Sequence, residues 1–294
     1  MNSVLITGGT GFLGRALVHE LLQRGTERIC IFSRDEAKQA AMRAQIQDPD
    51  ARLHWFVGDV RDRQRLVRAM HGVDTVIHAA ALKRVETGEY NPGELVKTNV
   101  LGTMNAIEAA FDAPYERAWA PRHVVYISSD KACQPLNAYG ASKLMGEKLV
   151  LGAHNTRGRH GPAFSVVRYG NVTGSTGSVI PTWRRAMQSG ESITITDPDA
   201  TRFWMQPNQA VDLVLSVAES VIDDKATAAG RLHVPTLPAY RLGDLAAAMD
   251  LPRVRASGLG AGEKLHERML ENGPDSSQVR RMTIDELREG LAKL

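Results

Sequence analysis

The segment VLITGGTGFLG, residues 4–14, decides the fold of this chain. Its apolar half predicts a buried strand, and Gly8, Gly11 and Gly14 follow directly where a helix begins. Glycines at this spacing allow a tight turn, a close approach of the backbone to a pyrophosphate, and close packing of helix on strand. The N–H groups that start such a helix stabilise phosphate charge. The segment therefore predicts a dinucleotide-binding loop rather than a plain tight turn.

Short apolar runs alternate with helical patterns from this segment to residue 169. The runs are continuously apolar, as expected for strands that helices cover on both faces. We therefore predict an α/β fold, a doubly wound parallel (Rossmann) sheet with a smaller, discontinuous substrate-binding lobe. The predicted strands are 4–7, 29–33, 53–57, 75–79, 124–128 and 163–169, and the predicted helices are 12–23, 36–47, 64–71, 92–111 and 138–154.

The regular alternation ends after residue 169. Residues 170–209 are rich in Gly, Ser, Thr and Pro, while 211–222 and 284–294 indicate helices and 232–234 a seventh strand. We expect the site in a cleft between two domains. The predicted dinucleotide-binding domain comprises 1–172 plus about 206–236, and the predicted substrate-binding lobe comprises about 173–205 and 237–294.

The composition is that of an ordinary globular protein, with 43% hydrophobic and 23% charged residues among 294. A formal net charge of +3 does not favour nucleic acid as a partner. Cys30 and Cys133 lie at no metal-ligand spacing and form no disulfide framework, which indicates a reducing compartment. No apolar run approaches the ~18 residues of a spanning helix, and the chain enters a strand too early for a signal peptide. We expect a cytoplasmic protein that binds no metal, nucleic acid or membrane.

The residues after the second predicted strand should read the adenosine ribose. A carboxylate there would accept from a 2′-hydroxyl, whereas the hydroxyl of Ser33 and the guanidinium of Arg34 suit a 2′-phosphate. We therefore expect NADP rather than NAD, although Asp35 and Glu36 could repel the phosphate or cap the next helix. The other expected cofactor contacts follow strands or lie in the glycine loop: Gly8, Thr10, Gly11, Phe12, Leu13, Gly14, Asp59, Val60, Ala79, Ala80 and Ala81.

Tyr139 and Lys143 are four residues apart and share one face of a predicted helix. An ammonium group one turn away, together with the positive charge of the bound nicotinamide, would stabilise the phenolate and lower the pKa of Tyr139. Lys143 could also bind the nicotinamide ribose, so both residues count as cofactor contacts. Ser129, at the end of the preceding strand, would share a substrate hydroxyl with Tyr139. Together these groups would remove a proton from an alcohol while its C–H gives hydride to the cofactor.

With these motifs the chain resembles extended short-chain dehydrogenases/reductases that act on nucleotide sugars. It looks most like the inverting UDP-N-acetylglucosamine 4,6-dehydratases of bacterial glycan biosynthesis. The resemblance implies transient oxidation at C4, loss of water across C5 and C6, and return of hydride to C6. It also implies a dimer, or a multiple of dimers, in which helices 92–111 and 138–154 pair. The matching strings, which span nearly the whole chain, are TGGTGFLG, IFSRDEAKQ, HAAALKRVETGEYNP, VKTNVLGT, SSDKACQPLNAYGASK, RYGNVTGSTGSVIP, TRFW and GEKLHE.

Asp130 and Lys131 separate the dehydratases from related enzymes. Sugar 4-epimerases of similar build have small, non-acidic residues after the active-site serine, and retaining dehydratases have Asp-Glu. By resemblance, Asp130 would be the acid at the C6 hydroxyl and Lys131 the base at C5. Since a base must be neutral, we predict a pKa for Lys131 well below about 10. The alternative is a surface salt bridge between the two.

The substrate contacts implied by the resemblance lie in other strings. Asn171 would contact the nucleotide sugar beside the cofactor contact Val172. Three residues depart from the family pattern: Gly260 and the following alanine replace Arg-Pro, and Thr176 stands where arginine is common. The remaining expectations are Lys83 near the sugar or phosphates, Arg202 as a diphosphate clamp, Glu263 facing the nucleoside, Asn99 bracing the site wall, and Arg253 or Arg255 compensating for the lost cations.

The departures leave the nucleotide and the sugar open. The enzymatic alternatives are a retaining 4,6- or 5,6-dehydratase and a 4-epimerase of another nucleotide sugar. The alternative from another class is a catalytically idle NADP-binding regulator. Ser129, Asp130, Lys131, Tyr139 and Lys143 argue against this regulator, because such a protein has no chemical need for all five.

Overall fold

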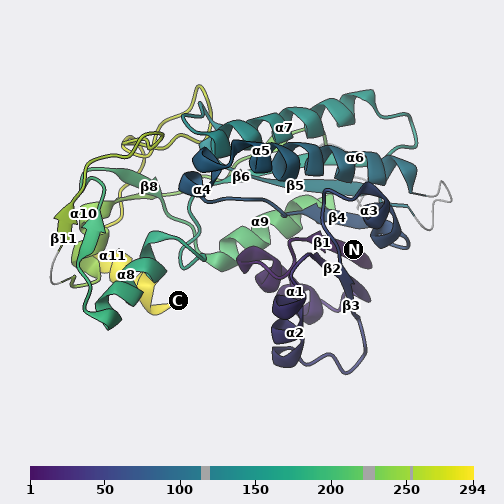
Figure 1. Cartoon of the computed structure of the whole chain (residues 1–294), viewed down its shortest axis with the longest axis horizontal. Coiled ribbons are helices and arrows are strands. Elements are labelled where there is room, and N and C mark those ends of the chain that lie inside the picture. Colours follow the sequence, from purple (N-terminus) through teal and green to yellow (C-terminus); the bar gives the residue numbers. More distant parts are fainter. Residues whose placement is uncertain (114–119, 221–228, 252–253) are drawn as a thin grey trace.

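A seven-stranded parallel sheet forms the centre of the protein (Figure 1). The computed structural model describes residues 1–113, 120–220, 229–251 and 254–294. Strand order reverses at β1 and β4, so the carboxyl ends of these strands border the crevice where doubly wound sheets bind ligands. The predicted fold class is confirmed. In sheet order the strands are β3 (Leu53–Val57), β2 (Arg28–Ser33), β1 (Ser3–Thr7), β4 (Thr75–His78), β5 (His123–Ser129), β6 (Ala163–Tyr169) and β9 (Leu232–His233).

Helices cover both faces of this sheet, which explains the continuous apolar runs. Leu5 packs into the cluster on one face, whereas its neighbours Val4 and Ile6 pack into the cluster on the other. No helix in the described part of the chain has the length and apolar character needed to cross a membrane. The first face carries α3 (Arg63–Met70), α6 (Gly102–Asp112) and α7 (Ala138–Thr156), and the second carries α1 (Phe12–Gln23), α2 (Glu36–Gln45) and α9 (Pro207–Ser220).

The helix predicted over residues 92–111 is not continuous. It consists of α5 (Pro92–Leu95), a π-helical segment (Val96–Leu101) and α6. A π-helix shifts the hydrogen-bond register by one residue, and such segments often occur at functional sites. An additional short helix, α4 (Val85–Tyr90), precedes it. The predicted end of the 211–222 helix lies outside the described residues.

A second group of elements packs at one end of the molecule, away from β2 and β3 (Figure 1). Its buried cluster joins Trp183 and Trp204 to Tyr240 and Leu287, so two separate stretches of chain share one core. We propose that these stretches form the substrate-binding lobe. Its elements are α8 (Val179–Ser189), β7 (Ile193–Ile195), β8 (Thr201–Phe203), β10 (Ala239–Arg241), α10 (Leu242–Ala248), β11 (Val254–Ala256) and α11 (Ile284–Ala292), with β8 paired to β10 and β7 to β11.

Candidate active site

The glycine loop joins β1 to α1 at the point where the strand order reverses. Gly8 has a φ of 70°, and a Cβ there would lie 2.9 Å from the Cα of Ala80. A Cβ on Gly14 would lie 2.6 Å from the backbone of Gly9. Helix α1 has neither a side-chain cap nor an acidic residue in its first turn, so its opening N–H groups can face an anion. These features fit a pyrophosphate and leave no room for side chains at these glycines.

Side chains at the start of α1 reach two other parts of the predicted cofactor site. Phe12 and Leu13 pack against the buried cluster that contains Val172. The buried hydroxyl of Thr10 donates to Ser33 Oγ at 2.9 Å. Sequence reasoning missed Arg15, whose Nε donates to the Thr10 carbonyl at 3.1 Å.

At the end of β2 the Ser33 side chain is buried, whereas the Arg34 side chain that follows it is exposed. Ser33 Oγ accepts from Thr10 and from the Asp35 backbone N–H at 3.3 Å, so its hydroxyl is engaged within the protein. Arg34 is 59% exposed, with its guanidinium 4.0 Å from Asp59 Oδ2. Asp35 caps α2 by accepting from the Lys38 N–H at 2.9 Å. Arg34 is therefore the residue of this group that is available to a 2′-phosphate.

Asn99 braces the segment that follows β4. Its Oδ1 accepts from the Leu82 N–H at 2.8 Å, and its Nδ2 donates to the Leu82 carbonyl and to Ser142 Oγ, both at 2.9 Å. These bonds confirm the predicted structural role, because they tie the segment to α7. The half-buried Ala79, Ala80 and Ala81 begin this segment. Val60 packs closely against Gly102, since a Cβ added to Gly102 would lie 2.7 Å from the Val60 side chain.

The end of β5 and the start of α7 bring the predicted chemical groups together. Ser129 Oγ donates to Asp130 Oδ1 at 2.8 Å, and its hydroxyl also hydrogen-bonds Tyr139. Helix α7 begins close to this turn, since a Cβ on Gly140 would lie 2.2 Å from the Lys131 carbonyl oxygen. Asp130 is fully buried, and its Oδ2 has no hydrogen-bond partner among the described residues. The site therefore holds a carboxylate oxygen without a protein partner beside two hydroxyl groups.

The predicted lowering of the Tyr139 pKa is not seen in the protein without bound nicotinamide. Burial raises the pKa of Tyr139, and the cation that opposes this rise is Lys131. Lys143 Nζ instead donates to the Ile127 carbonyl at 2.5 Å and lies 4.1 Å from the centre of the Tyr126 ring. Burial lowers the pKa of Lys143 to about 7, although Glu147 opposes the shift. In this structure the Lys143 side chain is therefore engaged by a backbone carbonyl of β5.

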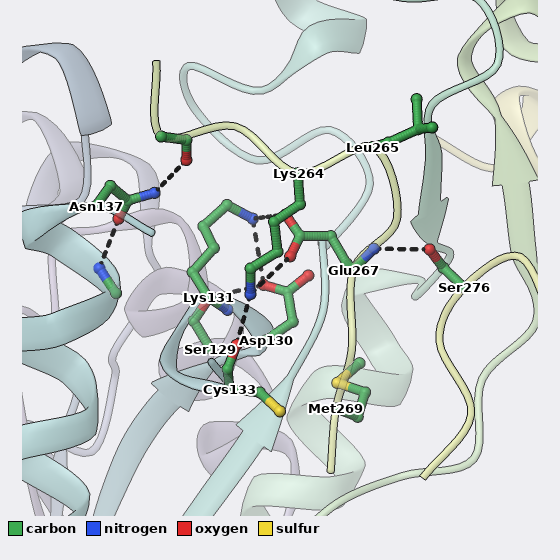
Figure 2. Close-up of polar contacts among 12 residues, drawn as sticks. Ser129, Asp130, Lys131, Cys133, Asn137, Lys264, Leu265, Glu267, Met269 and Ser276 are labelled. Carbon is green, nitrogen blue, oxygen red and sulfur yellow. Dashed lines mark hydrogen bonds and ion pairs between the residues drawn. The ribbon is translucent and has the colours of Figure 1, made fainter. Parts of the chain in front are cut away.

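The predicted low pKa of Lys131 is wrong. Burial lowers the pKa of Lys131, but the carboxylates of Asp130 and Glu267 outweigh burial and raise it above its ordinary value. Lys131 Nζ lies 3.2 Å from Asp130 Oδ1 and 3.5 Å from Glu267 Oε1 (Figure 2). The pair is not a surface salt bridge, because Asp130 is fully buried. Sequence reasoning missed Glu267, although it ends the quoted string GEKLHE.

Two of the predicted substrate residues lie at Lys131. Asn171 Oδ1 accepts from Lys131 Nζ at 3.2 Å. The guanidinium of Arg202 is close enough to oppose the raised pKa of Lys131, and it donates to the Thr201 and Leu265 carbonyls. The other candidates are exposed and make no contact with Lys131 in the described structure: Lys83, Thr176, Arg255 and Glu263. Glu263 accepts instead from the Gly260 N–H. Arg253 lies outside the described residues.

A buried ion pair lies behind the site and was missed by sequence reasoning. Glu147 is one turn beyond Lys143 on α7, and Arg168 is on β6; each side chain is 3% exposed. Arg168 Nε donates to Glu147 Oε1 at 2.8 Å, and Ser128 Oγ donates to the same oxygen at 2.5 Å. Arg168 also donates to the Met269 carbonyl at 2.6 Å. The pair therefore joins β5, β6, α7 and the segment that carries Glu267.

Comparison with known proteins agrees with this geometry. Residues 4–287 match the family model described as "Polysaccharide biosynthesis protein". The chain is 42% identical over 274 residues to a UDP-N-acetylglucosamine 4,6-dehydratase (inverting) of Campylobacter jejuni, covering 92% of this chain and 78% of the relative. It is 39% identical over 279 residues to a UDP-glucose 4-epimerase of Rickettsia rickettsii, with the same coverage of each. The X-ray structure of Pen from Bacillus thuringiensis matches with a TM-score of 0.90 and 31% identity, covering 100% of this chain and 98% of that one.

Proposed function

Because the chain belongs to the polysaccharide biosynthesis protein family, within the extended short-chain dehydrogenases/reductases, we propose that it is an inverting UDP-N-acetylglucosamine 4,6-dehydratase. The observation that carries this proposal is the buried Asp130 with its unpartnered Oδ2, in contact with Lys131 and directly after Ser129. A 4-epimerase only removes and returns hydride at C4, so it has no need for an acid at C6. The 42% identity to an enzyme of that name supports the choice of substrate.

The glycine loop and Arg34 would hold NADP, the cofactor we infer from the exposed guanidinium after β2. NADP would supply the hydride acceptor for C4 oxidation and the hydride donor for C6. Tyr139 and Ser129 would bind the C4 hydroxyl, and Tyr139, once its phenol has lost its own proton, would take the proton of that hydroxyl. Lys143 would orient the nicotinamide ribose once its Nζ leaves the Ile127 carbonyl.

Water loss requires an acid at the C6 hydroxyl and a base at C5. Asp130 and Glu267 raise the pKa of Lys131 and so favour its ammonium form, which must lose a proton before it can accept one from C5. The 3.2 Å contact between Lys131 Nζ and Asp130 Oδ1 offers a direct route. Transfer along it produces a neutral amine and a carboxylic acid, the two forms that the reaction needs. Exclusion of water by a bound sugar would favour this neutral pair over the ion pair, since burial penalises charge. Reprotonation of C5 from the opposite face would then invert that centre.

The test is incubation with UDP-N-acetylglucosamine and NADP in deuterated water. We expect a product lighter by one water, with inverted C5 by proton NMR and deuterium at C5. Lys131→Ala should abolish the deuterium incorporation, whereas C4 oxidation by Tyr139 should continue. A product of unchanged mass would indicate an epimerase, and retained C5 a retaining dehydratase. Absence of any product from nucleotide sugars, despite bound cofactor, would indicate the regulator.

We also propose that the chain forms a homodimer through α6 and α7. Met104 on α6 is 41% exposed and Met145 on α7 is 50% exposed, at a groove of about 400 Å³ between the two helices. A second copy would cover these apolar side chains. We expect Met145→Glu to convert the dimer to a monomer in analytical ultracentrifugation. A wild-type protein that sediments as a monomer would refute the proposal.

In a cell, we infer that the product feeds surface glycan biosynthesis.

A further inference from the structure

Glu267 places a second buried carboxylate beside Lys131. Its side chain is 4% exposed, and Oε1 lies 3.5 Å from Lys131 Nζ. Its Oε2 lies 3.8 Å from Lys264 Nζ and has no hydrogen-bond partner in the described structure (Figure 2). A buried carboxylate is costly unless it is paired or hydrogen-bonded. The ammonium groups of Lys131 and Lys264 supply this pairing, so the charge of Glu267 acts directly on Lys131.

The position of Glu267 is held from both sides. Its backbone N–H donates to Ser276 Oγ at 2.9 Å. On the other side, Asn137 Nδ2 donates to the Gly262 carbonyl at 2.9 Å, and Lys264 Nζ donates to the Cys133 carbonyl (Figure 2). The last two bonds connect the segment to the turn after β5 and to the first residues of α7. The carboxylate is therefore fixed relative to Lys131 rather than carried on a free loop.

We propose that Glu267 is a positioning residue that holds the Lys131 amine between Asp130 and Asn171 and sets the pH at which this amine becomes a base. Its consequence for catalysis rests on the proposed dehydratase function, whereas its effect on Lys131 does not. Asp130 has the larger effect on the Lys131 pKa, but its Oδ1 is shared between Ser129 and Lys131, whereas Glu267 Oε1 adds a second carboxylate contact from another segment.

Other charged and titratable groups also face Lys131. Burial and the guanidinium of Arg202 favour the neutral amine, while Asp130, Glu267 and Tyr139 favour the ammonium form. Tyr240 on β10 also lies within the electrostatic reach of Lys131. Lys264 partly offsets the charge of Glu267 from the far side. Loss of the Glu267 charge would leave Asp130 as the single carboxylate among these groups, so Lys131 would lose its proton at lower pH.

The first experiment measures Lys131 directly and needs no turnover. The full-length chain is labelled with trace acetic anhydride at a series of pH values, and acetylation of Lys131 is followed by mass spectrometry. We expect Glu267→Gln to move the midpoint of labelling to lower pH by about one unit or more. Glu271→Gln, an exposed carboxylate four residues further on, should leave the midpoint unchanged. Labelling curves that coincide for wild type and Glu267→Gln would overturn the proposal.

The second experiment measures the consequence for the reaction. With UDP-N-acetylglucosamine, the acidic limb of deuterium incorporation at C5 should move to lower pH in Glu267→Gln, while the rate of C4 oxidation stays at the wild-type value. A shifted labelling curve without water loss from any nucleotide sugar would refute the dehydratase and keep the role of Glu267. Water loss with neither curve shifted would refute the role of Glu267 alone.

A second variant provides the same test in case Glu267→Gln does not fold. If circular dichroism shows that Glu267→Gln does not fold, Glu267→Leu removes the same charge without burying an amide. We expect the same downward shift in Lys131 labelling, and a wild-type curve would again overturn the proposal.

Discussion

Replacing Glu147 with leucine should lower the free energy of unfolding by about 3–5 kcal/mol, the usual cost of leaving a buried charge without its partner. Glu147 and Arg168 are each 3% exposed and make two close contacts, Nε–Oε1 at 2.8 Å and Nη2–Oε2 at 2.5 Å. The substitution leaves the guanidinium with the Met269 carbonyl as its acceptor in the described structure. Because folded proteins are stable by about 5–15 kcal/mol, this loss is a large fraction of the total.

Urea unfolding followed by far-UV circular dichroism measures this loss, which should lower the midpoint and leave the m-value unchanged. The double variant Glu147→Leu/Arg168→Met should recover much of the loss, because an apolar pair has no charge to desolvate. The control is Glu20→Gln, which breaks an exposed pair of similar length, the 2.8 Å contact with Arg24, and should cost less than about 1 kcal/mol. A cost for Glu147→Leu as small as that of the control would refute the reasoning.

Three further predictions concern the cofactor site and the buried lysine. Gly14→Ala would place a methyl group 2.6 Å from the Gly9 backbone, so cofactor affinity in a calorimetric titration should fall about tenfold or more. The control is Gly152→Ala, where the added methyl group meets no atom within 4 Å and the cofactor should bind normally. Equal affinities of the two variants would contradict the loop geometry. Arg34→Ala should weaken NADP about tenfold and leave NAD unchanged, and a parallel loss for both would remove the basis for the NADP preference. Burial lowers the pKa of Lys143 to about 7, below the ordinary value of about 10.4. Between these two pH values the folded chain therefore binds fewer protons than the unfolded chain, so the free energy of unfolding of the wild type should rise with pH. Lys143→Met should flatten this rise in urea unfolding at several pH values, and an unchanged slope would contradict the assignment.

Elements of the central sheet could be predicted because they are long and locally patterned. The strand predicted over 53–57 and the helix predicted over 12–23 agree with the structure at both ends. The π-helical segment Val96–Leu101 could not be predicted, since its altered register accompanies contacts of Asn99 with Leu82 and Ser142, which come from other elements. The three-residue strands of the proposed lobe escaped notice because each pairs with a partner far along the chain.

The sequence by itself determined which chemical groups meet at the carboxyl end of β5. Ser129, Asp130 and Lys131 are consecutive, and Tyr139 follows at the start of the next helix, so local geometry was enough to bring them together. Only the tertiary structure decided their protonation states. A pKa depends on burial and on the summed charge of every neighbour, and the second carboxylate beside Lys131, that of Glu267, comes from a distant segment. The same packing placed Lys143 Nζ at the Ile127 carbonyl, which no spacing along the helix could have indicated.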